Sequence, residues 1–282
     1  AHPIGEPSSF AVEPEVIHYQ SSSERVSRHF GEPFEEAVEE LTVHARLYRT
    51  PLEPRGVVLW CHGGPISQTR VTYNPRLTSV LNAGYHVLYP DFRGSSGWGR
   101  RYRDALKGGY GAADVVDALC GLAELDDRGL VGSLPVISVG GSSGGLTALG
   151  LLARAPRRVV GAIVSYPVSD LWSLRTRTHR FERHLFDELV GDPVSDRRRY
   201  RQRSPKSWSY PSGRALIFQG SQDSVVPAPL TRSLVKRLAR TIEVEYVEFK
   251  GAGHGWSDPG FLEEERVRML RFLDEVSSAT LN

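Results

Sequence analysis

Short apolar runs alternate with amphipathic segments along most of the chain. Residues 41–48 alternate apolar and polar positions, which predicts a half-buried strand. Residues 56–61 (GVVLWC) form a continuous apolar run, as expected of a strand covered on both faces. Similar runs follow at residues 85–89, 135–139, 159–164, 215–218 and 244–249.

Helical patterns lie between these runs. Apolar residues recur at helical spacing in 114–125, 229–239 and 261–276, and residues 146–155 are small and apolar, as in a buried helix. Strands and helices that alternate from residue 56 onward predict an α/β fold, with a mostly parallel central sheet and helices on both faces. Residues 168–212 interrupt the alternation without a strand pattern, so we expect a short helical cap insertion there.

The composition is that of an ordinary globular chain. Of 282 residues, 40% are hydrophobic and 24% are charged, and 35 basic residues nearly balance 33 acidic ones. This balance argues against a nucleic-acid partner. No uncharged apolar run approaches the ~20 residues that cross a bilayer, so we expect no membrane partner. The first 30 residues lack a signal-peptide pattern, which favours a cytoplasmic location.

Charge is unevenly distributed along the chain. Residues 1–40 hold nine acidic and two basic side chains, whereas residues 170–214 hold eleven basic and six acidic ones. We therefore expect an acidic N-terminal arm over residues 1–41 and an α/β domain over residues 42–282. Both charged segments could be solvated faces. Alternatively the arm packs near the cap, within one subunit or across a dimer, and narrows an entrance.

A glycine-rich segment directly after the strand at 135–139 carries the most informative motif. Residues 139–146 (VGGSSGGL) hold G-x-S-x-G in two overlapping registers, with Ser142 or Ser143 at the centre. A nucleophilic serine on a sharp strand-to-helix turn needs small residues two positions before and after it. The helix that follows directs its amide groups toward a developing oxyanion. A glycine-rich turn that binds a phosphate is the alternative.

An acid and a base follow in the order that an α/β-hydrolase requires. Asp223 comes just after the apolar run at 215–218, and His254 follows the run at 244–249. Both positions are loops at the carboxyl ends of parallel strands, where sites in such sheets form. A serine nucleophile needs a histidine base, which in turn needs a carboxylate to orient it.

The loop after the first buried strand completes the candidate chemistry. Its sequence, HGGP at 62–65, leaves the amide groups of Gly63 and Gly64 free to line the oxyanion site. His62 is better explained as a structural hydrogen-bonding residue than as a second base. The histidines lack the spacing of a zinc site, so no metal or other cofactor is implied. Cys61 and Cys120 are interpreted as free buried thiols.

Five motifs follow one another along the chain: HGGP at 62–65, DFRGSSGWGR at 91–100, GGSSGG at 140–145, GSQDSVVP at 220–227 and GAGHGW at 251–256. With them, the chain resembles the catalytic domain of the prolyl oligopeptidase family of serine peptidases from about residue 12 to its end. The acylaminoacyl-peptidase-like branch is the closer match, on THRFE at 178–182, LVG at 189–191, Tyr200 and Ser-Pro at 204–205.

This resemblance implies an α/β-hydrolase fold and sets the serine register. The family's G-G-S-x-G-G places the nucleophile at Ser142 and makes the amide of Ser143 an oxyanion donor. Asp223 and His254 fall on the family's acid and base. Gly63 and Gly64 fall where the family has its other oxyanion donor.

The expected function is a serine hydrolase that cleaves a peptide or aminoacyl-amide bond through an acyl-enzyme. A carboxylesterase or thioesterase-type hydrolase of a small-molecule ester is the alternative, because the triad alone does not distinguish them. A non-catalytic binding protein on the same fold is disfavoured by the intact triad. Trp172, Phe181 and Val226, with Leu185 and Phe186, are candidates for an acyl pocket or for the core of the cap.

One departure from the family concerns its architecture. Members usually carry an N-terminal β-propeller that gates the site, and 282 residues leave no room for one. We therefore expect either a hydrolase domain that stands alone or a piece of a longer chain. The family's rules on substrate length do not carry over, and a homo-oligomer is left open.

Overall fold

The computed structural model describes residues 12–31, 34, 36–177 and 180–280, without the side chains of 180–182, 279 and 280. An eight-stranded sheet with the order β1-β2-β4-β3-β5-β6-β7-β8 runs through it. In this order the strands from β4 to β8 are parallel to one another. At one edge, β2 runs antiparallel to β4, and β1 runs antiparallel to β2. This sheet confirms the predicted α/β-hydrolase fold. The strands are β1 (Glu15–Ser21), β2 (Leu41–Tyr48), β3 (Gly56–Cys61), β4 (Tyr85–Asp91), β5 (Val136–Gly141), β6 (Val159–Ser165), β7 (Arg214–Gly220) and β8 (Glu243–Phe249).

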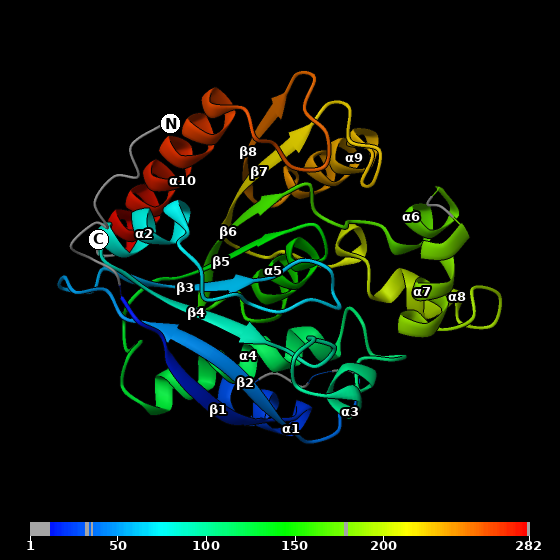
Figure 1. Cartoon of the computed structure of the whole chain (residues 1–282), viewed down its shortest axis with the longest axis horizontal. Coiled ribbons are helices and arrows are strands. Elements are labelled where there is room, and N and C mark those ends of the chain that lie inside the picture. The colour runs from blue at the N-terminus through cyan, green and yellow to red at the C-terminus, as the bar shows by residue number, and fades with distance from the viewer. Residues whose placement is uncertain (1–11, 32–33, 35, 178–179, 281–282) are drawn as a thin grey trace.

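Helices cover both faces of the sheet (Figure 1). On one face, α2 (Pro75–Asn82) and α10 (Pro259–Thr280) pack their apolar side chains on the strands. On the other face lie α1 (Ser23–Phe30), α4 (Ala113–Asp127), α5 (Ser143–Arg154) and α9 (Ala228–Leu238). Because the central strands are buried on both sides, their residues are apolar in succession, which is the pattern that the sequence shows. A short helix, α3 (Arg100–Asp104), follows β4.

The expected cap consists of three helices that project beside the sheet (Figure 1). They are α6 (Leu171–Arg177), α7 (Arg180–Val190) and α8 (Arg197–Gln202), and a 3₁₀ turn at Pro205–Ser207 leads back to β7. Arg175 of α6 binds Asp187 of α7, with 2.5 Å between Nε and Oδ1. Backbone hydrogen bonds from Gly108 N to Glu188 O (2.9 Å) and from Tyr110 N to Leu189 O (3.1 Å) hold the cap to the loop before α4.

Part of the acidic N-terminal segment belongs to the sheet. Strand β1 pairs with β2 from Glu15 opposite Leu47 to Ser21 opposite Leu41, so the sheet continues across the expected boundary at residues 41 and 42. Farther along the same segment, Glu36 accepts hydrogen bonds from Arg203, which follows α8 of the cap (Nη2 to Oε2, 2.5 Å). The division into an arm and a separate domain stays a prediction.

Candidate active site

Ser142 lies on a sharp turn between β5 and α5. Its backbone has φ 55° and ψ −122°, a left-handed conformation that is strained for a residue other than glycine. Ser142 N donates to Ser165 O at 3.0 Å, and Ser142 O accepts from Val168 N at 3.1 Å, so the surroundings hold the strained backbone in place. A Cβ at Gly144 would lie 2.2 Å from Cys61 O, which explains why glycine stands two positions after Ser142.

His254 links this serine to a buried carboxylate. Its Nε2 lies 3.1 Å from Ser142 Oγ, and its Nδ1 lies 2.8 Å from Asp223 Oδ2. The Nδ1–H donates to the carboxylate, so Nε2 is left to accept the serine proton. The loops after β7 and β8 are tied together by a hydrogen bond from Gln222 N to Ala252 O (2.9 Å).

The Asp223 carboxylate is fixed by its own hydrogen bonds. The residue is 6% exposed, and its Oδ1 accepts from the amides of Val225 (2.9 Å) and Val226 (2.8 Å). The other oxygen, Oδ2, faces His254, with Gln219 Nε2 3.3 Å away. Because one oxygen is occupied by two amides, the other has a single orientation toward the imidazole.

Backbone amides approach Ser142 from two sides. The amide of Ser143 begins α5, where a helix leaves its N–H groups without intrahelical partners. A Cβ at Gly63 would lie 3.7 Å from the Cβ of Ser142, so the loop after β3 runs close to the nucleophile. His62 holds this loop: its Nδ1 donates to Gly63 O (2.8 Å), and its Nε2 lies 2.7 Å from Ser95 Oγ. Burial lowers the pKa of His62, which favours the neutral imidazole.

A buried group of hydrogen-bonded polar side chains supports the turn at Ser142 and Ser143. The sequence analysis did not predict it. Tyr110 donates to Ser143 Oγ at 2.8 Å. Asp114 accepts from Gly111 N and from Thr147 Oγ1, each at 2.7 Å. Burial raises the pKa of Asp114 to about 6. The only sequence signal is an aspartate in the first turn of α4, among residues that are mostly apolar or small in the first half of that helix.

An apolar cavity of about 110 Å³ opens beside Ser142 toward the cap. Val226 lines this cavity, and its role in binding substrate stays a prediction. Trp172 does not line it: the ring packs edge-on against Tyr200 at 5.8 Å and lies beneath the Arg197 guanidinium. The side chain of Phe181 lies outside the described residues. The lining side chains are those of Pro65, Tyr110, Ser142, Ser143, Val168, Leu174, Leu185, Phe186, Leu189, Val225 and Val226, together with Gly64.

A larger and more polar cavity, of about 510 Å³, opens on the other side of Ser142. His254 lines this cavity and not the apolar one. Its wall includes Arg76 of α2 and Glu265 of α10, whose side chains form an ion pair (2.5 Å). Neither residue was singled out from the sequence, because they lie far apart in the chain and meet only through helix packing.

The described residues show no group of three His, Cys, Asp or Glu side chains that could hold a metal ion. Cys61 and Cys120 are free and buried, as predicted. In the described part of the chain, every helix is too short or too polar to span a bilayer.

The sheet, the sharp turn after β5 and the serine, histidine and aspartate on strand-end loops define an α/β-hydrolase. Over residues 72–280, which are most of its length, the sequence matches the prolyl oligopeptidase family. The chain belongs to this family.

Two curated relatives illustrate the likeness. Acylamino-acid-releasing enzyme 1 of Oryza sativa subsp. japonica is 30% identical over 217 residues, which are 73% of this chain and 28% of that protein. Dipeptidyl aminopeptidase BIII of Pseudoxanthomonas mexicana is 29% identical over 216 residues, 73% of this chain and 31% of that one. The chain thus spans about a third or less of the length of these relatives.

A solved structure gives the same result. A puromycin-hydrolyzing peptidase of Mycobacterium tuberculosis superposes with a TM-score of 0.81 at 25% identity, covering 96% of this chain and 40% of that one. This likeness, together with the family match, supports the predicted class of serine peptidase.

Proposed function

We propose that this chain acts as a serine peptidase that cleaves a peptide or aminoacyl-amide bond after an apolar residue. The observation that carries the proposal is the continuous hydrogen-bonded line from Ser142 Oγ through His254 to Asp223. In this line the imidazole has one nitrogen free to take the serine proton and the other held by a carboxylate.

Acylation begins when Ser142 Oγ attacks the substrate carbonyl carbon and His254 Nε2 takes the hydroxyl proton. The imidazolium that forms is stabilised by the Asp223 carboxylate at 2.8 Å. The carbonyl oxygen becomes an oxyanion, which the amide of Ser143 and that of Gly63 or Gly64 stabilise by hydrogen bonds. The positive end of the α5 dipole acts in the same direction.

Collapse of this intermediate breaks the bond to the leaving amine, which receives its proton from His254. The product is an ester between Ser142 and the acyl group. A water molecule then repeats the sequence: His254 takes its proton, the water oxygen attacks the ester, and Ser142 leaves with the proton that His254 returns. Burial of Asp223 keeps the imidazole in one orientation through both halves.

The apolar cavity gives the acyl side its preference. It opens directly beside Ser142, and the side chains around it are almost all apolar. Its volume of about 110 Å³ suits a single medium-sized apolar side chain, since a cavity of about 150 Å³ holds benzene. We therefore expect leucine or methionine before the scissile bond to be preferred over charged residues.

A fluorophosphonate probe and a matched set of substrates test this function. We expect the probe to label the wild-type chain and to spare Ser142→Ala. Leucyl and N-acetyl-leucyl nitroanilides, short leucyl peptides and a short-chain ester then rank amide against ester cleavage. Fast ester cleavage with no cleavage of any amide would overturn the peptidase assignment, and an unlabelled wild-type chain would overturn hydrolysis altogether.

A further inference from the structure

We propose that the polar cleft on the His254 side binds the free carboxylate of a short leaving group. The substrates favoured would then be small peptides that end one or two residues after the scissile bond. This inference rests on the proposed function, because it assigns the cleft to the leaving half of that reaction. The cleft consists of the 510 Å³ cavity described above and a second cavity of about 490 Å³ that shares Trp60, His62 and Arg76 with it.

The position of His254 assigns the leaving group to this cleft. The imidazole protonates the leaving amine, so that amine must lie within hydrogen-bond reach of Nε2. His254 and Ser142 both line the 510 Å³ cavity. Ser142 also lines the apolar cavity, but His254 does not. The acyl side chain and the leaving group therefore have separate compartments on the two sides of the serine.

The charges of the cleft favour an anion. Its lining contains two guanidinium groups, those of Arg70 and Arg76, against one carboxylate, that of Glu265. Glu265 is already engaged: it accepts from Ser165 Oγ (3.1 Å) and Trp256 Nε1 (2.9 Å), in addition to its ion pair with Arg76. It thus holds one edge of the Arg76 guanidinium, which has donors in excess of this single partner.

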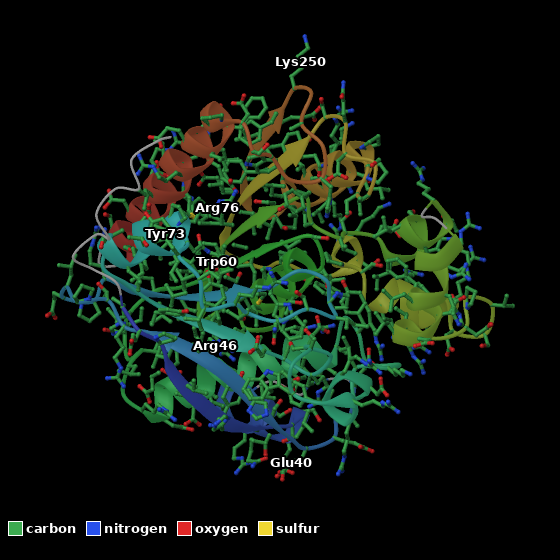
Figure 2. The ribbon with its side chains drawn as sticks, in the orientation of Figure 1. Glu40, Arg46, Trp60, Tyr73, Arg76 and Lys250 are labelled. Atoms are coloured by element: carbon green, nitrogen blue, oxygen red, sulfur yellow. The ribbon has the colours of Figure 1, made fainter. Side chains whose placement is uncertain are left out.

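Figure 2 shows Arg76 and Trp60 at neighbouring positions between α2 and β3, and both line the two cavities. The Trp60 ring stacks on that of Tyr89, with centroids 5.4 Å apart and planes 19° apart. This aromatic pair provides an apolar wall beside the Arg76 charge. A leaving amino acid has the same two parts, an apolar side chain and a carboxylate.

Two buried hydroxyl groups in the same wall lack partners. Tyr89 is 7% and Thr69 is 8% exposed, and both line the 490 Å³ cavity. Within the described residues, the Tyr89 hydroxyl and Thr69 Oγ1 have no hydrogen-bond partner. A buried polar group left unpaired destabilises a fold, so two of them in a cavity wall that also contains Arg76 favour a ligand that supplies acceptor atoms. A carboxylate has two acceptor oxygens.

The experiment compares leaving groups that differ only in this charge. Leucyl substrates with Gly or Gly-Gly as the leaving group are cleaved as free acids and as C-terminal amides, and kcat/KM is measured for each. We expect the acids to be preferred by about ten-fold or more, which is the effect of one hydrogen bond to a charged group. Arg76→Gln should reduce this acid-to-amide ratio to near one, and Arg76→Lys should restore part of it.

Two further variants separate recognition from folding. Arg55→Gln also removes a guanidinium that is paired with a carboxylate, that of Asp274, but it lies outside both cavities, so it should leave the ratio unchanged. Tyr89→Phe removes a hydroxyl that has no hydrogen-bond partner among the described residues. It should lower the ratio several-fold without lowering the urea midpoint of unfolding, even if Arg76→Gln fails to fold.

Binding gives a second readout that needs no turnover. Calorimetry with Ser142→Ala should detect Gly-Gly at least ten-fold more tightly than Gly-Gly amide. Equal binding of the two, or a wild-type acid-to-amide ratio near one, would overturn the carboxylate site and leave the proposed function standing. Failure of the proposed function has a different signature: no amide is cleaved and the fluorophosphonate probe does not react, while binding still tests the cleft.

Discussion

The strand-end scaffold of the triad and the helical cap both contribute walls to the site, but they are built in different ways. Ser142, Asp223 and His254 follow three parallel strands. Backbone hydrogen bonds tie the loops of Asp223 and His254 to each other and the turn at Ser142 to the residues at the end of β6. In its described residues the cap at α6–α8 contains no strand, and its helices are joined by partly exposed ion pairs such as Arg175–Asp187. It is joined to its neighbours by backbone hydrogen bonds, by the Lys107–Glu188 ion pair and by Arg203, which binds Glu36 and donates to the carbonyl oxygens of the loop before α4.

Because of this difference, we expect the scaffold to determine catalysis and the cap to determine substrate preference. The scaffold places reacting atoms by the geometry of the sheet, so a small change there removes a whole chemical step. The cap supplies apolar side chains to a cavity wall, where a change alters a volume and hence a preference. Variants of the scaffold should therefore lower turnover of every substrate, and variants of the cap should reorder substrates.

Replacing the nucleophile should have the largest effect. Ser142→Ala removes the attacking oxygen, and we expect turnover to fall by ~10⁴-fold or more on all substrates. Ser143→Ala keeps the backbone amide that faces the oxyanion and should lose less than about ten-fold. Steady-state kinetics on one amide and one ester measure both. Equal losses of turnover in the two variants would show that the assignment of Ser142 as the nucleophile is wrong.

The orienting carboxylate comes next. In Asp223→Asn the amides of Val225 and Val226 hold the side-chain oxygen, so the new NH₂ group faces His254 Nδ1. It donates there, which puts the imidazole proton on Nε2 and leaves no base for Ser142. We expect a loss of about 10⁴-fold in kcat with little change in the unfolding midpoint. Full activity of this variant would show that Asp223 has no role in orienting His254.

The sequence predicted the scaffold well because its information is local. Each triad residue follows an apolar strand within a few positions, and glycine marks the turns where the backbone must be tight. The edge strand β1 escaped notice: only Ile17, Tyr19 and Ser21 face inward, since its other face is solvated. The most evident feature of this segment in the sequence is its acidic charge, which does not indicate a strand.

The walls of the two cavities could not be predicted in the same way. Arg76 and Glu265 meet through the packing of α2 beside α10, and Tyr110 reaches Ser143 from a loop before α4. Such contacts depend on helix positions, which hydrophobic periodicity leaves undetermined. Trp172 was a candidate for the acyl pocket or for the core of the cap, and its ring packs against Tyr200 inside the cap.

A buried carboxyl in the scaffold should make stability depend on pH. Burial raises the pKa of Asp114 from 3.8 to about 6 in the fold. As pH rises from about 4 to 6, the unfolded chain loses this proton first, so the free energy of unfolding falls and stays lower above pH 6. Asp114→Asn is uncharged at every pH and lacks this fall. Between pH 4 and 7, the free energy of unfolding of this variant should therefore rise on the order of 2–3 kcal/mol relative to that of the wild type. Urea unfolding at several pH values measures the difference, and parallel profiles would contradict it.

The smallest effect, and the one that tests the cap, concerns substrate preference. Phe186 of α7 is partly buried and lines the apolar cavity, so Phe186→Ala enlarges the cavity and removes little of the core. We expect kcat/KM to shift by about ten-fold from leucyl toward phenylalanyl substrates, because a change of one group in an apolar pocket is worth about 1–3 kcal/mol. His184→Ala is the matched control, since its side chain is 80% exposed on the same helix. An acetyl ester has no side chain to place in the cavity, so its hydrolysis should change less than that of either peptide series. If Phe186→Ala instead lowers kcat for leucyl, phenylalanyl and acetyl substrates by one common factor, the cap supports the triad itself, and the division of work between the two regions is wrong.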